Sequence, residues 1–330
     1  MEATSLLFTE GAQTLPAHPA ATPVRFFAGD GYELGGILYA RLGDAAPEHA
    51  VVFNCGAGIP AVCYQHFARF LASRGLPILT YDYRGIALSH PGTLRGFSAI
   101  VEDWSQYDCD GAIAWMRTRY PAAQLTGVAH SVGALLFGGA DHSAELARYA
   151  FIGPHTGYWR DYRPRHRLPM ALLWHGVMPA LTRAWGYFPA SWLGLGDDIP
   201  AGIALQWAAR RTPQVDPSAL GHSADEARQR RVLARFREVR GSVLALSTSD
   251  DAFATEEGAG RLLACYPGLR AERARITPGE AGLRALGHFG FFRRAAGTSL
   301  WPKLCDWLQR PDGRWEGATA SGALHDTGSA

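Results

Sequence analysis

The stretch Gly127-Val128-Ala129-His130-Ser131-Val132-Gly133-Ala134 places one serine between an apolar run and a helix-forming segment. This is the pattern of a nucleophile elbow, a sharp turn from strand to helix that exposes a reactive serine. The turn strains the backbone, so the residues two before and two after the serine must be small, and here they are Ala129 and Gly133. Short patterns of this kind also arise by chance in chains rich in Gly and Ala. Ser131 is therefore a candidate nucleophile whose partners must be sought elsewhere in the chain.

An acid pair and a histidine follow this serine along the chain. The apolar run from Gly241 to Ser247 predicts a buried strand, and it is followed by Asp250 and Asp251. His288 comes later, in a glycine-hinged loop ahead of the last predicted helix. A histidine in this role accepts the hydroxyl proton of the serine, while a carboxylate orients the imidazole and stabilises its charged form. The sequence thus predicts a Ser-His-Asp arrangement in which either aspartate is the acid.

The other histidines lack this setting. Each of the three features above is more often structural than catalytic when it stands alone, but their joint appearance in order favours catalysis. His130 adjoins the nucleophile and is included among the candidate substrate-binding residues, although side-chain alternation would turn it away from the serine. Five more are expected mostly at the surface or at caps: His66, His142, His155, His175 and His222.

Strand-like and helix-like segments alternate along the chain. This rhythm predicts an α/β fold with a mostly parallel central sheet and helices on both faces. The first two strands, joined by Gly29-Asp30-Gly31, predict an antiparallel hairpin at its edge. The main expected helices are Ala61 to Arg74, Val101 to Arg119 and Val132 to Arg148. The expected strands are Val24 to Ala28, Leu34 to Tyr39, His49 to Asn54, Leu76 to Asp82, Leu125 to Ala129, Tyr149 to Gly153, Ser242 to Leu246 and Ala271 to Ile276.

Two loops and one helix extend the pattern. Val51 to Gly58 ends a predicted strand in a Gly-Ala-Gly turn, and Tyr81 to Ser89 contains Asp-Tyr-Arg-Gly-Ile-Ala-Leu-Ser. Trp104 and Asp108 lie on the predicted helix before the elbow. With these segments and the order Ser, Asp, His, the chain resembles the α/β-hydrolase superfamily along nearly its whole length. It is most similar to the bacterial predicted hydrolases of the serine-aminopeptidase or monoacylglycerol-lipase type.

The resemblance implies roles for several residues. The family's acid is usually followed three residues on by a small apolar residue, which favours Asp251, with Asp250 as the alternative. The oxyanion would be bound by the backbone N–H of Val132 and by that of Ile59, after the third strand, with Gly58 allowing a close approach. The departures from the family pattern are Asn54-Cys55 in place of histidine, Ala87 in place of glycine, and Ala129 at the elbow.

Residues 154–240 interrupt the alternation and are rich in aromatic side chains. The family inserts a helical cap, or lid, at this point, so we expect a core of residues 1–153 and 241–310 beneath it. Most of these rings should pack the cap against the core, whereas Trp159 is a candidate substrate contact. The small, polar tail 311–330 is expected to be disordered.

Composition narrows the class of protein. A length of 330 residues suits one large domain with an insertion, and a net charge of +2 argues against an electrostatic nucleic-acid partner. Five cysteines without metal-binding spacing are expected to be reduced thiols, and the N-terminus lacks the pattern of a secretory signal. No apolar run approaches the ~20 residues that span a bilayer. We expect a cytoplasmic protein without cofactor, metal or stable membrane insertion, and its oligomeric state, monomer or homo-oligomer, is left open.

Together these features predict a serine esterase acting on an apolar small-molecule ester through an acyl-enzyme. The same residues would serve an amidase, aminopeptidase, thioesterase or acyltransferase. A serine nucleophile counts against the dehalogenases and epoxide hydrolases of this fold, which generally use an aspartate. The alternative from another class is a catalytically silent hydrolase fold that binds a small molecule.

Overall fold

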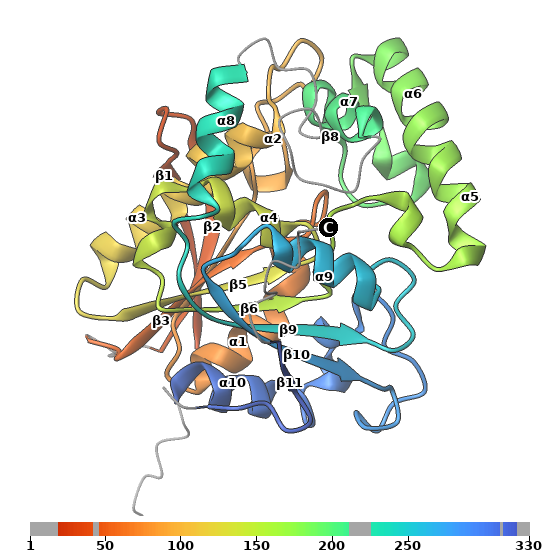
Figure 1. Ribbon diagram of the computed structural model, residues 1–330. Coiled ribbons are helices and arrows are strands. Elements are labelled where there is room, and N and C mark those ends of the chain that lie inside the picture. The colour runs from red at the N-terminus through yellow and green to blue at the C-terminus, as the bar shows by residue number, and fades with distance from the viewer. Residues whose placement is uncertain (1–18, 42–45, 211–225, 311–312, 322–330) are drawn as a thin grey trace, which may run out of the picture.

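A nine-stranded sheet forms the centre of the computed structural model, which describes residues 19–41, 46–210, 226–310 and 313–321 (Figure 1). The strands lie in the order β1-β2-β4-β3-β5-β6-β9-β10-β11. Those from β4 to β10 in this order are parallel, and antiparallel strands flank them at both edges. The strands are β1 (Ala20–Phe27), β2 (Glu33–Ala40), β3 (His49–Asn54), β4 (Ile78–Tyr81), β5 (Gln124–His130), β6 (Arg148–Ile152), β9 (Gly241–Thr248), β10 (Leu269–Ile276) and β11 (Thr319–Ser321).

The predicted mostly parallel sheet is confirmed. Every predicted strand is present, and the first two pair as the expected antiparallel hairpin. Strands β3 and β6 are buried along their whole length, as expected for continuous apolar segments covered on both faces. Helices α1 and α10 cover one face of the sheet, and α3 and α9 cover the other (Figure 1). These helices are α1 (Gln65–Ser73), α3 (Asp110–Arg119), α9 (Glu256–Ala264) and α10 (Trp301–Gln309).

The helix expected after the elbow is much shorter than predicted. Helix α4 covers only Gly133–Leu136, and two 3₁₀ turns separated by an extended residue replace the rest. Two adjacent glycines, Gly138 and Gly139, stand where the helix was expected to continue, and glycine destabilises a helix interior. A Cβ atom on Gly138 would lie 2.1 Å from Phe236 Cε1, and one on Gly139 would lie 2.2 Å from Ser105 Oγ. Both positions pack against neighbouring side chains, so a residue with a higher helical propensity does not fit there. The expected helix Val101 to Arg119 is formed, with a short α2 (Val101–Asp103) and a π-helical turn preceding α3.

Between β6 and β9 lies the inserted segment, residues 154–240, of which 154–210 and 226–240 are described. It is mainly helical and stands beyond the carboxyl ends of the parallel strands (Figure 1). The mean hydropathy and length of the helices in the described ranges do not reach those of a membrane span. The elements are α5 (Pro164–Leu172), α6 (Met178–Trp185), the two-residue strands β7 (Tyr187–Phe188) and β8 (Ile199–Pro200), α7 (Ala201–Ala209) and α8 (Glu226–Arg235).

The tail differs from the expectation of disorder. Residues 319–321 form β11, which pairs antiparallel with β10 and extends the sheet by one strand. Trp315 is buried and joins the hydrophobic core. Burial of this indole and pairing with the edge strand β10 thus order a segment that otherwise consists of small and polar residues. Residues 311–312 and 322–330 lie outside the described part of the chain.

Candidate active site

The turn between β5 and α4 has the geometry of a nucleophile elbow. Ser131 has φ +60°, one of two positive values among the non-glycine residues described. Its N–H donates to the carbonyl of Ile152 at 2.9 Å, which anchors the turn to the neighbouring strand. A Cβ atom on Gly133 would lie 2.4 Å from the carbonyl oxygen of Cys55, so only glycine fits there. The small residue required by the motif is thus explained by a close approach of two backbones.

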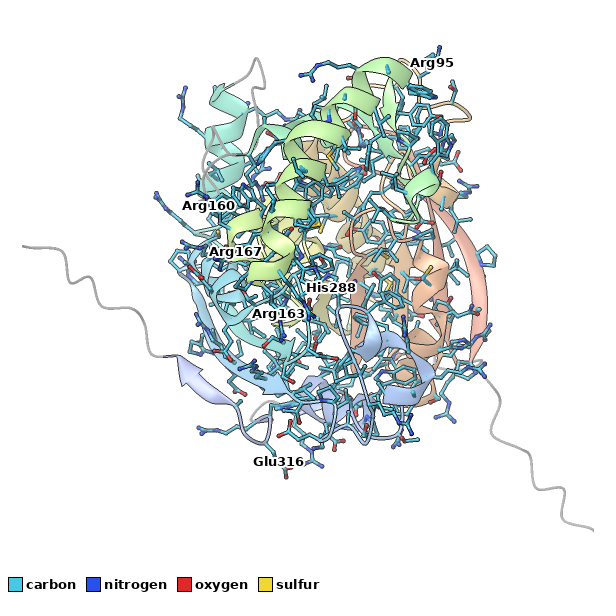
Figure 2. All side chains as sticks on the ribbon, turned by 90° about the vertical axis from the view of Figure 1, so that its right-hand side faces the viewer. Arg95, Arg160, Arg163, Arg167, His288 and Glu316 are labelled. Carbon is cyan, nitrogen blue, oxygen red and sulfur yellow. The ribbon has the colours of Figure 1, made fainter. Side chains whose placement is uncertain are left out.

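The structure brings Ser131, His288 and Asp251 into one hydrogen-bonded chain. The Ser131 hydroxyl donates to His288 Nε2, with 2.9 Å between Oγ and Nε2. His288 Nδ1–H donates to Asp251 Oδ2 at 2.7 Å. The serine follows β5, the aspartate follows β9, and the histidine lies in the loop before α10. Figure 2 shows His288 where the helices of the inserted segment meet the core.

The environments of the two neighbouring aspartates differ. Burial raises the pKa of Asp251, but the hydrogen bond and charge of His288 outweigh it, with help from the N–H groups of Phe253 and Ala254, and the pKa falls to about 2. The carboxylate therefore stays ionised and can only accept hydrogen bonds from the imidazole. Asp250 instead accepts the N–H of Leu286 at 2.8 Å, two residues before the histidine. Asp250 thus holds the histidine loop, whereas Asp251 contacts the ring.

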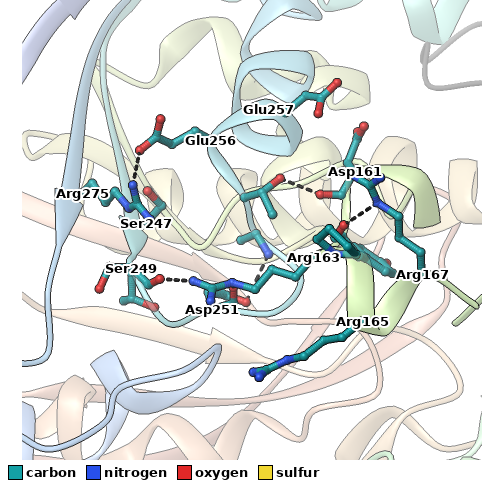
Figure 3. Close-up of a pocket in the computed structure, with 15 residues that line it drawn as sticks. Asp161, Arg163, Arg165, Arg167, Ser247, Ser249, Asp251, Glu256, Glu257 and Arg275 are labelled. Atoms are coloured by element: carbon teal, nitrogen blue, oxygen red, sulfur yellow. Dashed lines mark hydrogen bonds and ion pairs between the residues drawn. The ribbon is translucent and has the colours of Figure 1, made fainter. Parts of the chain in front are cut away.

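Arg163 of the inserted segment holds the acid loop from the opposite side. Its Nε donates to the carbonyl of Asp251 at 2.8 Å, and its guanidinium also donates to the carbonyl of Ser249. These contacts face an arginine-lined pocket of about 770 Å³, which is shown in Figure 3. Asp251 lies between this pocket and the histidine, so its backbone is fixed independently of its side chain.

The loop after β3 differs from the predicted oxyanion turn in one residue. The N–H of Ile59 donates to the carbonyl of Gly56 at 3.1 Å, so it closes a turn and is not available to an oxyanion. Gly58, with φ +67°, accepts the N–H of Asp197 at 2.6 Å and does not line the site cavity. The N–H groups of Ala57 and Val132 have no hydrogen-bond acceptor among the described residues, and both residues line the cavity beside Ser131. Ala57 replaces Ile59 as the candidate partner of Val132.

A cavity of about 200 Å³ lies over Ser131 between the core and the inserted segment. Its wall is mainly apolar, and Arg210 is the one side chain with a permanent charge among its described lining residues. Trp159 is absent from this lining; its ring lies 6.3 Å from that of His175. Trp174 and Trp207, whose ring centroids are 5.9 Å apart, line the cavity in its place. Two other aromatic residues of the inserted segment therefore occupy the place at the cavity that was expected for Trp159.

The side chain of His130 lies beneath the site rather than in the cavity. Its Nε2–H donates to the carbonyl of His288 at 3.0 Å, and its Nδ1 accepts the hydroxyl of Tyr64 at 2.8 Å. Tyr64 in turn accepts the N–H of Gly56 at 2.9 Å. Burial, followed by the charge of His288, lowers the pKa of His130 well below its ordinary value, so the ring stays neutral. His130 does not line the cavity; it connects the loop of His288 to the turn after β3.

His155, expected at the surface or at a cap, is buried beside the serine. Its Nε2 lies 2.9 Å from Ser131 Oγ, on the same oxygen that His288 contacts. His155 is the third residue after β6, next to the strand that carries the serine. The signal that could have found it is this position, because polar residues after adjacent parallel strands meet at one edge of the sheet. Of the other four histidines in that prediction, His222 lies outside the described residues.

The Asp-Tyr-Arg-Gly loop quoted above serves as scaffold. Arg84 Nε donates to the buried Asp108 at 2.7 Å, and Trp104 Nε1–H donates to the carbonyl of Arg84 at 3.0 Å. Ala87 has φ +31°, in the left-handed region where the family has glycine. Its N–H donates to Asp197 of the inserted segment at 2.8 Å, which helps to hold this unusual conformation.

The parallel sheet, the elbow and the Ser-His-Asp chain define an α/β-hydrolase. The family model described as serine aminopeptidase, S33, matches residues 45–267, which is more than half of the chain. The chain therefore belongs to this family of hydrolases. A comparison with curated protein sequences gives no match.

Solved structures with this fold include an esterase and a peptidase. The chain is similar to the Pyrococcus furiosus esterase, with a TM-score of 0.55 and 14% identity over 91% of this chain and 92% of that one. The structure of DcsB, solved with a substrate analogue, is similar with a TM-score of 0.58 and 14% identity over 88% of this chain and 98% of that one. For the acylaminoacyl peptidase of Pyrococcus horikoshii the TM-score is 0.53 and the identity 13%, over 95% of this chain and 44% of that one. At these identities the similarity concerns the fold alone.

Proposed function

We propose that this chain is a serine hydrolase that cleaves a carboxylic ester through an acyl-enzyme on Ser131. The observation that carries the proposal is the hydrogen-bonded chain from Asp251 through His288 to Ser131 Oγ. As Oγ bonds to the carbonyl carbon, its proton passes to His288 Nε2, and the departing alcohol takes that proton. Water then attacks the acyl group, gives a proton to His288, and the proton returns to Oγ as the C–O bond breaks.

Charge on the carbonyl oxygen needs fixed donors at the moment it develops. We assign this role to the N–H groups of Ala57 and Val132, since both lie at the cavity and neither is used within the described structure. Removing one such donor typically costs about 3–4 kcal/mol of transition-state stabilisation. The turn after β3 keeps its Ile59 N–H bonded to Gly56, which supports the assignment to Ala57.

The cavity favours an apolar small-molecule acyl substrate over a peptide with a free amino terminus. No carboxylate lines its described wall to receive an α-ammonium group, and Arg210 would repel one. Its volume of about 200 Å³ is below the range of roughly 300–1,000 Å³ for drug-sized ligands, so a short acyl group fits. The inserted segment supplies much of this wall and acts as a cap that limits access of water.

The free thiols of all five cysteines support a cytoplasmic location.

Rates on p-nitrophenyl esters from acetate to dodecanoate, measured beside the matching anilides, test this function. We expect hydrolysis of the esters, a preference for short and medium chains, and much slower cleavage of the anilides. Faster cleavage of aminoacyl anilides would indicate a peptidase, and a preference for thioesters or for alcohol acceptors would indicate a thioesterase or acyltransferase. If no substrate turns over and no fluorophosphonate probe labels the folded protein, the silent binding fold is the better description.

Activity should fall as the pH is lowered. The active form needs neutral His288 to accept the serine proton, so protonation of this ring stops acylation. The two side chains that contact Ser131 and His288 keep their charge state: Asp251 stays ionised because its pKa is about 2, and His155 stays neutral because burial and nearby positive charge lower its pKa to about 3. A pH profile of kcat/KM on an ester whose own stability is constant over the range checks this. A flat profile would contradict a histidine base.

A further inference from the structure

Two histidines, not one, contact the nucleophile. Ser131 Oγ lies 2.9 Å from Nε2 of His288 and 2.9 Å from Nε2 of His155. The two rings approach from different elements, with centroids 5.3 Å apart. His155 and Ser131 are both buried, so water does not compete freely for these bonds. The Ser-His-Asp chain uses only one of the two contacts.

The backbone sets the tautomer of His155. The N–H of Gly157 donates to His155 Nδ1 at 2.9 Å, so this nitrogen carries no proton. A neutral imidazole has one N–H, which must then be at Nε2 and must point to Ser131 Oγ. Gly157 adopts φ +77°, a conformation that favours glycine and brings its N–H back to the ring two residues earlier. Burial and the charges of His288 and Arg210 lower the pKa of the ring, which keeps it neutral.

His288 has the opposite tautomer. Its Nδ1–H donates to the ionised Asp251, which leaves Nε2 as an acceptor. A hydroxyl has one proton to donate, so an oxygen that accepts from His155 directs that proton to His288. The two rings therefore have distinct roles on one oxygen: His155 is the donor and His288 is the base.

We propose that His155 is a fourth catalytic residue, whose Nε2–H donates to Ser131 Oγ, orients its proton and stabilises the oxygen as charge develops. This inference rests on the proposed serine chemistry and deepens it. During acylation, the proton of Oγ moves to His288 while the His155 N–H remains on its own ring. During deacylation, the same N–H stabilises Oγ as it leaves the acyl carbon. His155 neither gains nor loses a proton in either step.

The test compares His155→Gln with His155→Met. Both side chains are unbranched and similar in length, but only glutamine carries an N–H donor. Because a charge-assisted hydrogen bond to the reacting oxygen is lost, we expect Met to slow fluorophosphonate labelling of Ser131 by roughly 10- to 100-fold. Gln should recover a large part of that rate. A His142→Met variant, changed at a half-exposed histidine that does not line the cavity, is the matched control.

Rescue by glutamine distinguishes a hydrogen-bond donor from a packing role, because only glutamine restores an N–H at this position. Thermal unfolding verifies that both variants fold. Equal labelling rates for wild type and Met, or for Gln and Met, would overturn the proposal while leaving the serine mechanism intact. Failure of the serine mechanism looks different, because wild type itself would then not be labelled. If both variants unfold, NMR of isotopically labelled histidine nitrogens in the wild-type protein decides: a proton on Nδ1 of His155 would also overturn it.

Discussion

Ser131→Ala is expected to abolish ester hydrolysis, with kcat/KM falling by roughly four to six orders of magnitude. The change removes Oγ, the atom that both histidines contact and that would carry the acyl group. The loss should be in turnover rather than in binding, because the apolar wall of the cavity is unchanged. The decisive measurement is the rate on the best ester, together with fluorophosphonate labelling, which should disappear.

The fold should survive this substitution. Alanine keeps the Cβ atom and costs little more than serine at φ +60°, although it leaves the donor of His155 without its acceptor. A buried donor left unpaired costs about 1–3 kcal/mol, which thermal unfolding will register as a modest decrease in Tm. Ser299→Ala, which removes a hydroxyl bonded to the carbonyl of Ala281 away from the cavity, is the control and should keep full activity. Substantial hydrolysis by Ser131→Ala with Tm intact would mean that another residue performs the chemistry.

The residues of the Ser-His-Asp chain could be predicted because each depends on a local pattern. The elbow is a strand, a turn and a helix start within eight residues, and Asp251 lies three residues after an apolar strand. Parallel strands bring their carboxyl ends to one edge, so local patterns far apart in the sequence meet in the fold. The central strands could be predicted for a similar reason, since a continuous apolar run such as that of β3 is a strong signal for buried β-structure.

The remaining parts of the site depend on contacts that no local pattern records. The role of Ala57 follows from a turn in which Ile59 bonds to Gly56, and a sequence cannot show which N–H is left over. The role of His155 depends on the conformation of Gly157, which sets the tautomer of the ring. The need for glycine at 138, where the predicted helix ends early, has the same origin, since a bulky ring from another element occupies the space beside it.

Asp251→Asn should reduce kcat by about 10⁴-fold, whereas Asp250→Asn should cost less than about tenfold. An asparagine at 251 can present its NH₂ to His288 Nδ1, which favours the tautomer with the proton on Nε2, where it faces the serine and cannot accept its proton. The same change removes the negative charge that stabilises the imidazolium. At 250 the amide oxygen can still accept the N–H of Leu286, so the histidine loop keeps its anchor.

The pair of variants is informative because the two aspartates are adjacent, so the mutations disturb the same loop. The backbone contacts of Arg163 to Asp251 and Ser249 are unaffected by either change, which limits any collapse of the loop. A loss confined to Asp251→Asn, at unchanged Tm, isolates the orientation of His288 as the cause. The reverse order would make Asp250 the acid. Equal large losses with lowered Tm would show that the loop, rather than the tautomer, had failed, and substrate-independent NMR of the His288 ring would then be the remaining way to assign the acid.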